Sequence, residues 1–165
     1  MLRLRAAGAA CRRPLARRVV RLSSAGAVPE EGQELTWRRR FEAEDVAAFA
    51  AVTGDDNAIH REASEAFGAP IVHGALLASM FPALFARHFP GAVYRGQTLE
   101  FRSAVPVRSE VTARVSVRRV TSSRSRGAFV DCDTTVVSAE DAVAVEGAAR
   151  LWLPPRRRGG GAAGG

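Results

Sequence analysis

The chain has 165 residues, 47% of them hydrophobic, which suits one ordinary core and is short for two independent domains. Its formal net charge of +7 would by itself suggest a nucleic-acid or anionic-membrane partner, but residues 1–24 carry seven arginines and no acid, so the rest sums to zero. A body with that balance is not expected to bind a phosphate backbone, and we predict neither nucleic acid nor membrane as a partner.

The two ends of the chain differ in composition from its middle. Residues 1–24 are rich in arginine and alanine and close on two serines, which is typical of a mitochondrial transit peptide, so we predict localisation in the mitochondrial matrix. A disordered basic arm or an RNA tether is the alternative interpretation. Residues 155–165 contain only Pro, Arg, Gly and Ala, and are predicted to form a disordered tail after a single domain over residues 25–154.

The first half of this domain is predicted to be mainly helical. After a weak strand at residues 33–39, apolar residues at helical spacing and acids near the start predict a short amphipathic helix over residues 43–53, ended by Gly54. The segment 74–86 is apolar on all sides, so it is expected to be a buried helix, kinked by Pro82. It is too short to span a bilayer.

Alternating polar and apolar residues predict half-buried antiparallel strands in the second half, with Leu99 and Phe101 on the buried side of the first. Polar segments at 121–127 and 138–141 are expected to be turns. The predicted fold class is therefore α+β, a single domain in which an antiparallel sheet wraps around one long buried helix. The predicted strands cover residues 98–102, 111–118, 128–137 and 143–153.

The two cysteines, Cys11 and Cys132, are too few for a disulfide framework or a cysteine-based zinc site. Cys132 lies in an alternating segment and is predicted to be a buried or half-buried structural thiol. No other ligand cluster stands out in the sequence, so we predict neither a metal nor a redox cofactor.

The loop after the first helix concentrates chemically capable side chains. Taken singly, Asp55 and Asn57 are more often turn residues than catalysts, and His60 is more often a hydrogen-bonded surface histidine than a base. Their order along the chain, followed by a buried helix, favours a catalytic loop.

Two ordered blocks of sequence resemble a known family, the R-specific enoyl thioester hydratases of the MaoC-like hot-dog class. The resemblance covers roughly residues 33–154, and two blocks in order are more specific than one short pattern. The family usually has proline after the motif asparagine, where this chain has Ala58. The first block is Phe49, Thr53-Gly54-Asp55-x-Asn57-x-x-His60 and Ala66, and the second is Pro70-Ile71-Val72-His73-Gly74-x-Leu76-Leu77-Ala78-Ser79.

This resemblance implies a hot-dog fold and a hydro-lyase that interconverts (3R)-3-hydroxyacyl thioesters and trans-2-enoyl thioesters, carried by acyl carrier protein or coenzyme A. Together with the arginine-rich leader, it favours acyl carrier protein and mitochondrial fatty acid synthesis. In the family the site lies near a subunit interface. Because a single small sheet also leaves an edge strand and part of its apolar face uncovered, we predict a homodimer.

Elimination of water from a 3-hydroxyacyl thioester requires a base near the α-proton, an acid near the leaving hydroxyl and donors for the thioester oxygen. Asp55 and His60, across a tight loop from one another, can act on one shared water. The backbone N–H of Gly74, at a helix start, can serve as the donor. These three are the predicted catalytic residues, while His73 is expected to orient the turn at Gly74.

Four further residues are predicted to bind substrate: Asn57, Leu76, Leu77 and Phe81. Asn57 is expected to hold the loop by hydrogen bonds rather than to react. The three apolar residues are expected in the core, where some of them can line an acyl channel.

Three other functions stay open on the sequence. A hot-dog acyl thioesterase would use a carboxylate to activate water at the thioester carbon, and pairing of Asp55 with His60 disfavours it. A basic RNA-binding mitochondrial protein would need basic patches interleaved with aromatics, whereas Tyr94 is the only tyrosine in the chain. A non-catalytic partner of acyl carriers, with the fold but no turnover, is the third.

Overall fold

The structure, a computed structural model, describes residues 28–123 and 125–155. The predicted transit peptide, residues 1–24, lies outside the described residues, as does all but the first residue of the predicted tail, residues 155–165. Within the described residues, no helix is both long enough and apolar enough to cross a membrane.

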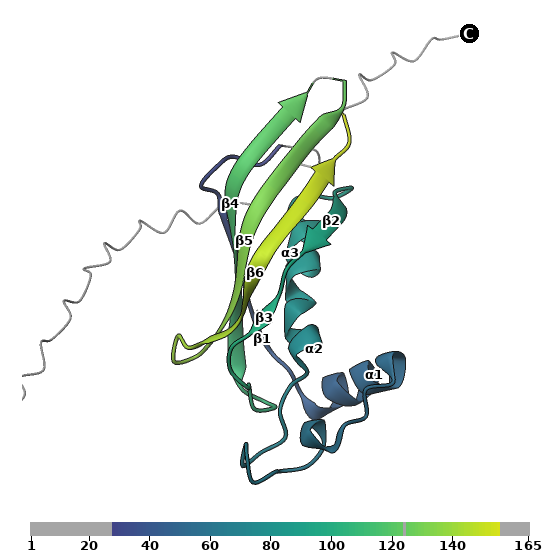
Figure 1. Cartoon of the computed structure of the whole chain (residues 1–165), viewed down its shortest axis with the longest axis vertical. Helices are drawn as coiled ribbons and strands as arrows, with labels where there is room; N and C mark the ends of the chain where they lie inside the picture. Colours follow the sequence, from purple (N-terminus) through teal and green to yellow (C-terminus); the bar gives the residue numbers. More distant parts are fainter. Residues whose placement is uncertain (1–27, 124, 156–165) are drawn as a thin grey trace, which may run out of the picture.

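An antiparallel sheet wraps around a buried helical segment, which confirms the predicted α+β hot-dog architecture (Figure 1). The strand order is β1–β4–β5–β6–β2, and the short strand β3 also pairs with β6. The three longest strands form a meander in which each pairs with its sequence neighbour. The strands are β1 (Glu34–Arg40), β2 (Val93–Gln97), β3 (Glu100–Phe101), β4 (Glu110–Ser123), β5 (Gly127–Ser138) and β6 (Val143–Leu153).

Buried and exposed residues alternate along the long strands, so the sheet has a buried inner face and a more exposed outer face. In β5, Val130, Cys132 and Thr134 are buried, while Asp133 between them is exposed. Burial, with a further contribution from the carboxylates of Asp131 and Asp133, raises the pKa of Cys132 to about 12. The thiol therefore stays protonated at neutral pH, in agreement with the predicted structural role.

The buried helical segment is divided into α2 (Gly74–Ala78) and α3 (Met80–His88), with a break at Ser79. The sequence predicts one helix over residues 74–86 with a kink at Pro82, whereas the structure interrupts the helix earlier and extends it further. Pro82 has no N–H to donate to the carbonyl one turn before it, and that missing hydrogen bond falls next to the break. Pro82 therefore interrupts the helix about one turn before its own position.

The strand predicted over residues 98–102 is wrong in position, because β2 precedes this segment and β3 occupies only part of it. Leu99 and Phe101, expected on the buried side, are 37% and 59% exposed. The connection between the two strands crosses β6 so closely that a Cβ at Gly147 would overlap the carbonyl oxygen of Thr98. The edge strand β2 has two adjacent hydrophobic residues, Val93 and Tyr94, in place of an alternating pattern from which it could have been predicted.

Candidate active site

The helix α1 (Ala43–Thr53) has its predicted bounds and leads directly into the loop that carries Asp55. Its end is set by Gly54, whose φ of 79° is a left-handed conformation that favours glycine. The N–H of this glycine donates to the carbonyl of Ala50 at 2.8 Å. The chain therefore turns sharply away from the helix, and Asp55 becomes the first residue of an exposed loop.

This loop closes with a turn of 3-10 helix, η1 (Ala58–His60). Asn57 caps the turn, because its Oδ1 accepts a hydrogen bond from the N–H of Ile59 at 3.4 Å. Ala58 occupies the first position of the turn, where proline is favoured because its fixed φ fits and no N–H is needed. Ala58, at the position where the family usually has proline, therefore still forms the first residue of the 3-10 turn.

His60 is held by the segment that precedes α2. Its Nδ1 lies 2.8 Å from the carbonyl oxygen of Ile71, whose own N–H donates to the carbonyl of Ile59 at 3.0 Å. Because a carbonyl can only accept, we assign the proton of the neutral ring to Nδ1. The other ring nitrogen, Nε2, then carries a lone pair and can accept a proton.

The carboxylate of Asp55 lies beside this nitrogen, with its Oδ2 atom 4.0 Å from Nε2 of His60. The distance exceeds that of a hydrogen bond, but one water or hydroxyl oxygen can lie about 2.8 Å from both atoms. The side chain of Asp55 is 53% exposed and that of His60 is 10% exposed, so the pair is reachable from solvent on one side. The structure brings the two predicted acid–base side chains to one point.

His73 is a third titratable side chain at this point, and its predicted role differs from its contacts. The sequence predicts that it orients the turn at Gly74, but its side chain makes no capping hydrogen bond to α2. Its Nε2–H instead donates to the carbonyl of Asp55 at 3.1 Å, and its ring stacks on that of His60 with centroids 3.6 Å apart. Contacts between residues so far apart have no local sequence signal beyond the presence of His73 in the second block of the resemblance.

Gly74 is the first residue of α2, so its N–H belongs to the donors that have no partner inside the helix. The ring of Phe101 in β3 covers this glycine, because a Cβ on Gly74 would lie only 2.6 Å from Cδ1 of Phe101. The sequence did not predict this contact, since it joins the start of a helix to a strand much later in the chain.

The predicted apolar substrate contacts lie within the core. Leu76, Leu77 and Phe81 are 9%, 2% and 0% exposed, respectively. Asn57, by contrast, is exposed in the loop. The core position of the three apolar residues agrees with the expectation that they belong to the core, and their role in an acyl channel stays a prediction.

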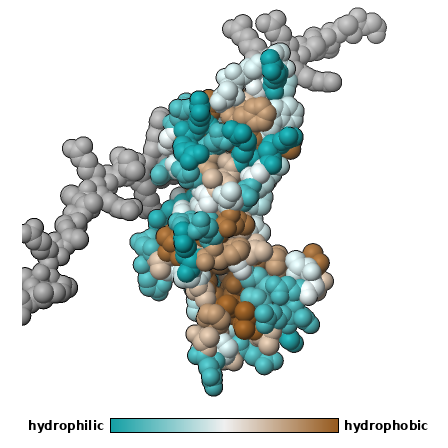
Figure 2. All heavy atoms as spheres, in the orientation of Figure 1, coloured by the Kyte–Doolittle hydropathy of each residue, from teal (hydrophilic) through white to brown (hydrophobic). Residues whose placement is uncertain are grey.

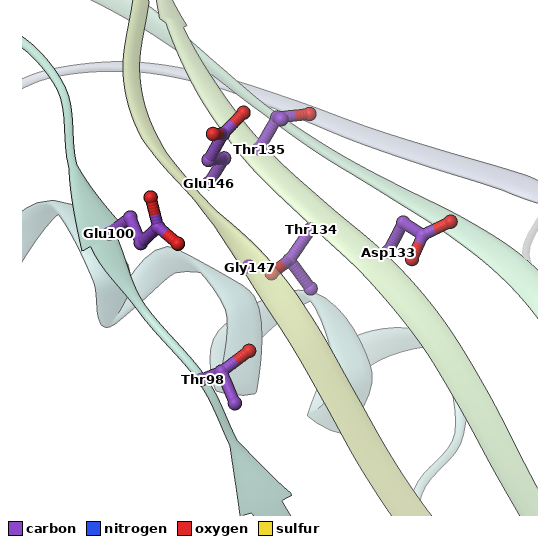
Figure 3. A pocket seen from close by; sticks show the side chains of 7 residues that line it. All are labelled: Thr98, Glu100, Asp133, Thr134, Thr135, Glu146 and Gly147. Atoms are coloured by element: carbon purple, nitrogen blue, oxygen red, sulfur yellow. The ribbon is translucent and has the colours of Figure 1, made fainter.

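A cavity of about 320 Å³ lies apart from these residues, beside β5, β6 and the connection between β2 and β3 (Figure 3). Its acids are paired with arginines, since Arg102 pairs with both Glu100 and Glu146, and Arg118 pairs with Asp133. It contains no base comparable to His60. The lining residues are Thr98, Glu100, Asp133, Thr134, Thr135, Glu146 and Gly147.

The side chains of Asp55, His60 and His73 could be taken for a metal site, because each offers a ligand atom within 4.8 Å of the others. The rings of the two histidines are stacked with centroids 3.6 Å apart and only 24° between their planes, so the Nε2 lone pairs lie in two nearly parallel planes, which is unfavourable for binding one ion. Nε2 of His73 also carries the proton that it donates to a carbonyl. The arrangement therefore suits acid–base chemistry better than metal binding.

Comparisons with known proteins identify relatives of this chain. The chain is 41% identical over 131 residues to an (R)-specific enoyl-CoA hydratase of Aeromonas caviae, covering 76% of this chain and 96% of that protein. It is 33% identical over 127 residues to a mitochondrial 3-hydroxyacyl-[acyl-carrier-protein] dehydratase of Arabidopsis thaliana, covering 74% of this chain and 76% of that protein.

Solved structures and a family description complete the comparison. The structure of the (R)-hydratase from A. caviae has a TM-score of 0.71 and 38% identity, and the match covers 79% of this chain and all of that one. An R-hydratase from Pseudomonas aeruginosa has a TM-score of 0.69 and 27% identity, over 78% of this chain and 84% of that one. The MaoC like domain matches residues 23–140. The chain therefore belongs to the MaoC-like dehydratase family.

Proposed function

We propose that this chain interconverts trans-2-enoyl thioesters and (3R)-3-hydroxyacyl thioesters by adding or removing water. The observation that carries the proposal is the separation of 4.0 Å between Oδ2 of Asp55 and Nε2 of His60, at a half-exposed point where one oxygen can contact both. Curated relatives named as an enoyl-CoA hydratase and as a 3-hydroxyacyl-[acyl-carrier-protein] dehydratase support it.

In the hydration direction, Asp55 and His60 hold one water against the β-carbon of the enoyl group. The water loses a proton to this pair as its oxygen bonds to the β-carbon, and the pair returns a proton to the α-carbon, so one water is added across the double bond. Dehydration runs through the same steps in reverse. General acid–base groups of this kind typically contribute ~10²–10⁴-fold to the rate.

The thioester oxygen gains negative charge as the β-carbon is attacked, and we assign its stabilisation to the backbone N–H of Gly74. This N–H has no partner inside α2, and the dipole of the helix start favours negative charge. Because Gly74 has no Cβ, the ring of Phe101 can pack against the start of this helix. We propose that Leu76, Leu77 and Phe81 contribute to the wall along which the acyl chain lies.

We assign the activity to mitochondrial fatty acid synthesis on acyl carrier protein, as in mitochondrial hydroxyacyl-thioester dehydratase of type 2. The composition of residues 1–24 and the relatives named mitochondrial, from A. thaliana and Solanum lycopersicum, support this assignment. Appending an unrelated mitochondrial presequence to residues 25–165 should restore import, whereas residues 25–165 alone should stay in the cytosol. Matrix import of the leaderless form would remove the targeting argument.

We also propose that the active form is a homodimer joined at the edge formed by β2 and β3. Val93 and Tyr94 on β2, Phe101 on β3 and Leu99 in the connection between them are all exposed hydrophobic residues. Figure 2 shows hydrophobic atoms interrupting the hydrophilic surface near β3 and α2. Because Phe101 covers Gly74, an interface at this edge would reach the active site. Sedimentation of active protein at micromolar concentration should give a dimeric mass, and a monomeric mass would refute the proposal.

The activity itself is tested by mixing the purified protein with crotonyl and longer trans-2-enoyl thioesters, on coenzyme A and on acyl carrier protein. We expect the enoyl absorbance to fall on both carriers and the product to be the (3R)-hydroxy enantiomer. Faster turnover on acyl carrier protein would support the mitochondrial assignment. Release of free thiol without loss of the double bond would instead indicate a thioesterase.

A further inference from the structure

We propose that His73 is a positioning residue for this reaction, which holds Asp55 and His60 in their reactive arrangement. The inference rests on the proposed function, because it assigns His73 a role through those two residues. The proposed mechanism gives His73 no chemical step. His73 is nevertheless only 2% exposed, and its ring stacks directly on that of His60.

Two hydrogen bonds cross between the same two chain segments in opposite directions. His60, in the loop, donates from Nδ1 to the carbonyl of Ile71 in the segment before α2, at 2.8 Å. His73, in that segment, donates from Nε2 to the carbonyl of Asp55 in the loop, at 3.1 Å. The two rings stack between these bonds, so each histidine anchors the other's segment. We call His60, His73 and their two carbonyl acceptors the histidine clasp.

Packing alone does not explain a histidine at position 73. The ring contacts Phe49, with centroids 5.0 Å apart, and His60, so a phenylalanine ring would fill the same space. The histidine also leaves its Nδ1 atom buried without a hydrogen-bond partner among the described residues. A buried unpaired acceptor is unfavourable for stability. What the histidine adds over phenylalanine is the Nε2–H donor to the carbonyl of Asp55.

This donor matters because Asp55 is otherwise weakly held. Asp55 follows Gly54, whose backbone is left-handed, and the side chain of Asp55 is 53% exposed. Anchoring the backbone carbonyl restricts where the carboxylate can lie relative to His60. A displacement of a reacting group by about 1 Å can cost on the order of 10²-fold in rate. Loss of the donor should therefore lower kcat more than it raises KM.

The test compares two substitutions in the full-length chain. His73→Phe keeps the ring and removes the donor, whereas His73→Gln removes the ring and places an amide N–H near the position of Nε2. We expect His73→Phe to lower kcat by on the order of 10²-fold, and His73→Gln to recover most of that loss. His88 serves as the matched control, because its Nδ1 is also buried and unpaired among the described residues while it lies at the other end of the helical segment. His88→Phe should leave kcat unchanged.

A double-mutant cycle separates positioning from a general structural role. If His73 acts through Asp55, His73→Phe should cost little further turnover once Asp55→Asn is present, whereas an independent loss would multiply. Equal kcat for folded His73→Phe and His73→Gln proteins, or the same factor in both backgrounds, would overturn the proposal.

A measurement on the unmodified protein covers the case in which His73→Phe fails to fold. The ¹⁵N shifts of the imidazole of His73 should report the tautomer protonated at Nε2, with an Nε2 proton that exchanges slowly. The Nδ1-protonated tautomer would contradict the clasp. Because this readout needs no turnover, absence of hydratase activity in the wild-type protein would count against the proposed function and not against the clasp.

Discussion

The active-site corner and the outer face of the sheet both gather ionisable side chains, but they are organised differently. On the outer face, acids are matched with arginines: Arg150 lies 2.7 Å from Asp131, and Arg118 lies 3.3 Å from Asp133. Such exposed pairs contribute little to stability and leave no group free to exchange protons with a ligand. They also neutralise arginines that an RNA-binding surface would need.

In the active-site corner, Asp55 lies beside two histidines and neither forms a close ion pair with its carboxylate. Each histidine instead uses one ring nitrogen to hold a backbone carbonyl. The carboxylate of Asp55 and the ring of His60 are therefore held near one another without a direct hydrogen bond between them. The difference indicates that reactivity depends on which partners are left open, and not on the number of charges.

The largest effect is expected from the acid and base themselves. Asp55→Asn and His60→Ala should each lower kcat by at least ~10²-fold, because each removes one member of the pair that acts on the shared water. The Asp55 side chain is 53% exposed, so thermal unfolding of Asp55→Asn should stay close to that of the wild type, whereas His60→Ala also removes the hydrogen bond to Ile71 and should melt at a lower temperature while still folding. Steady-state hydration of crotonyl thioester measures the first effect and a thermal melt the second. Near-normal turnover in either folded variant would sink the mechanism.

The combination of both changes sharpens the comparison. If Asp55 and His60 act on one water, the double variant should be little slower than the slower single variant, because the second substitution removes a group that is already disabled. Single-turnover rates of the four proteins measure this coupling. Strictly multiplicative losses would keep both residues important and reject the shared water.

A smaller loss is expected at the donor for the thioester oxygen. Gly74→Pro deletes this N–H, and removal of one such donor typically costs ~10²–10³-fold in kcat. The start of a helix accepts proline, and the ψ of 133° at His73 is one that a residue before proline adopts readily.

Gly74→Ala is the matched control, because both substitutions add a Cβ that must displace the ring of Phe101. Only the alanine keeps the N–H. Turnover of Gly74→Ala should therefore exceed that of Gly74→Pro clearly, and equal losses would attribute the effect to the displaced ring.

The smallest effect is expected on the outer face. The hydrogen bond from Arg150 lowers the pKa of Asp131, so its contribution to stability is present above about pH 4 and is lost as the pH falls through the lower folded value. Because the pair is exposed, Asp131→Asn should cost only about 0.2–1 kcal/mol at pH 7 and should leave kcat unchanged. Urea unfolding at pH 7 and at low pH measures the difference, which should vanish in acid. A large loss of turnover would contradict the division between the two regions.

Much of this molecule follows from the sequence, because its signals are local. Helical spacing together with Gly54 predicted α1 with its bounds, and alternation predicted β5 and β6 closely. The prediction for β4 was too short, because the strand continues to Ser123, into the segment 121–127 that was predicted as a turn. The order of Asp55, Asn57 and His60 identified the loop. These features depend on contacts within a few residues of the chain, which periodicity and turn chemistry record.

Tertiary packing decided the rest. The break at Ser79, the edge strand β2 and the exposure of Phe101 have no periodic signal, because they depend on which elements lie opposite one another. The stacking of His73 beneath His60 and its hydrogen bond to Asp55 join segments that only the folded sheet and helices bring together. The sequence by itself thus determined which residues can react, and the tertiary structure determined how they are held, since orientation is a property of long-range contacts.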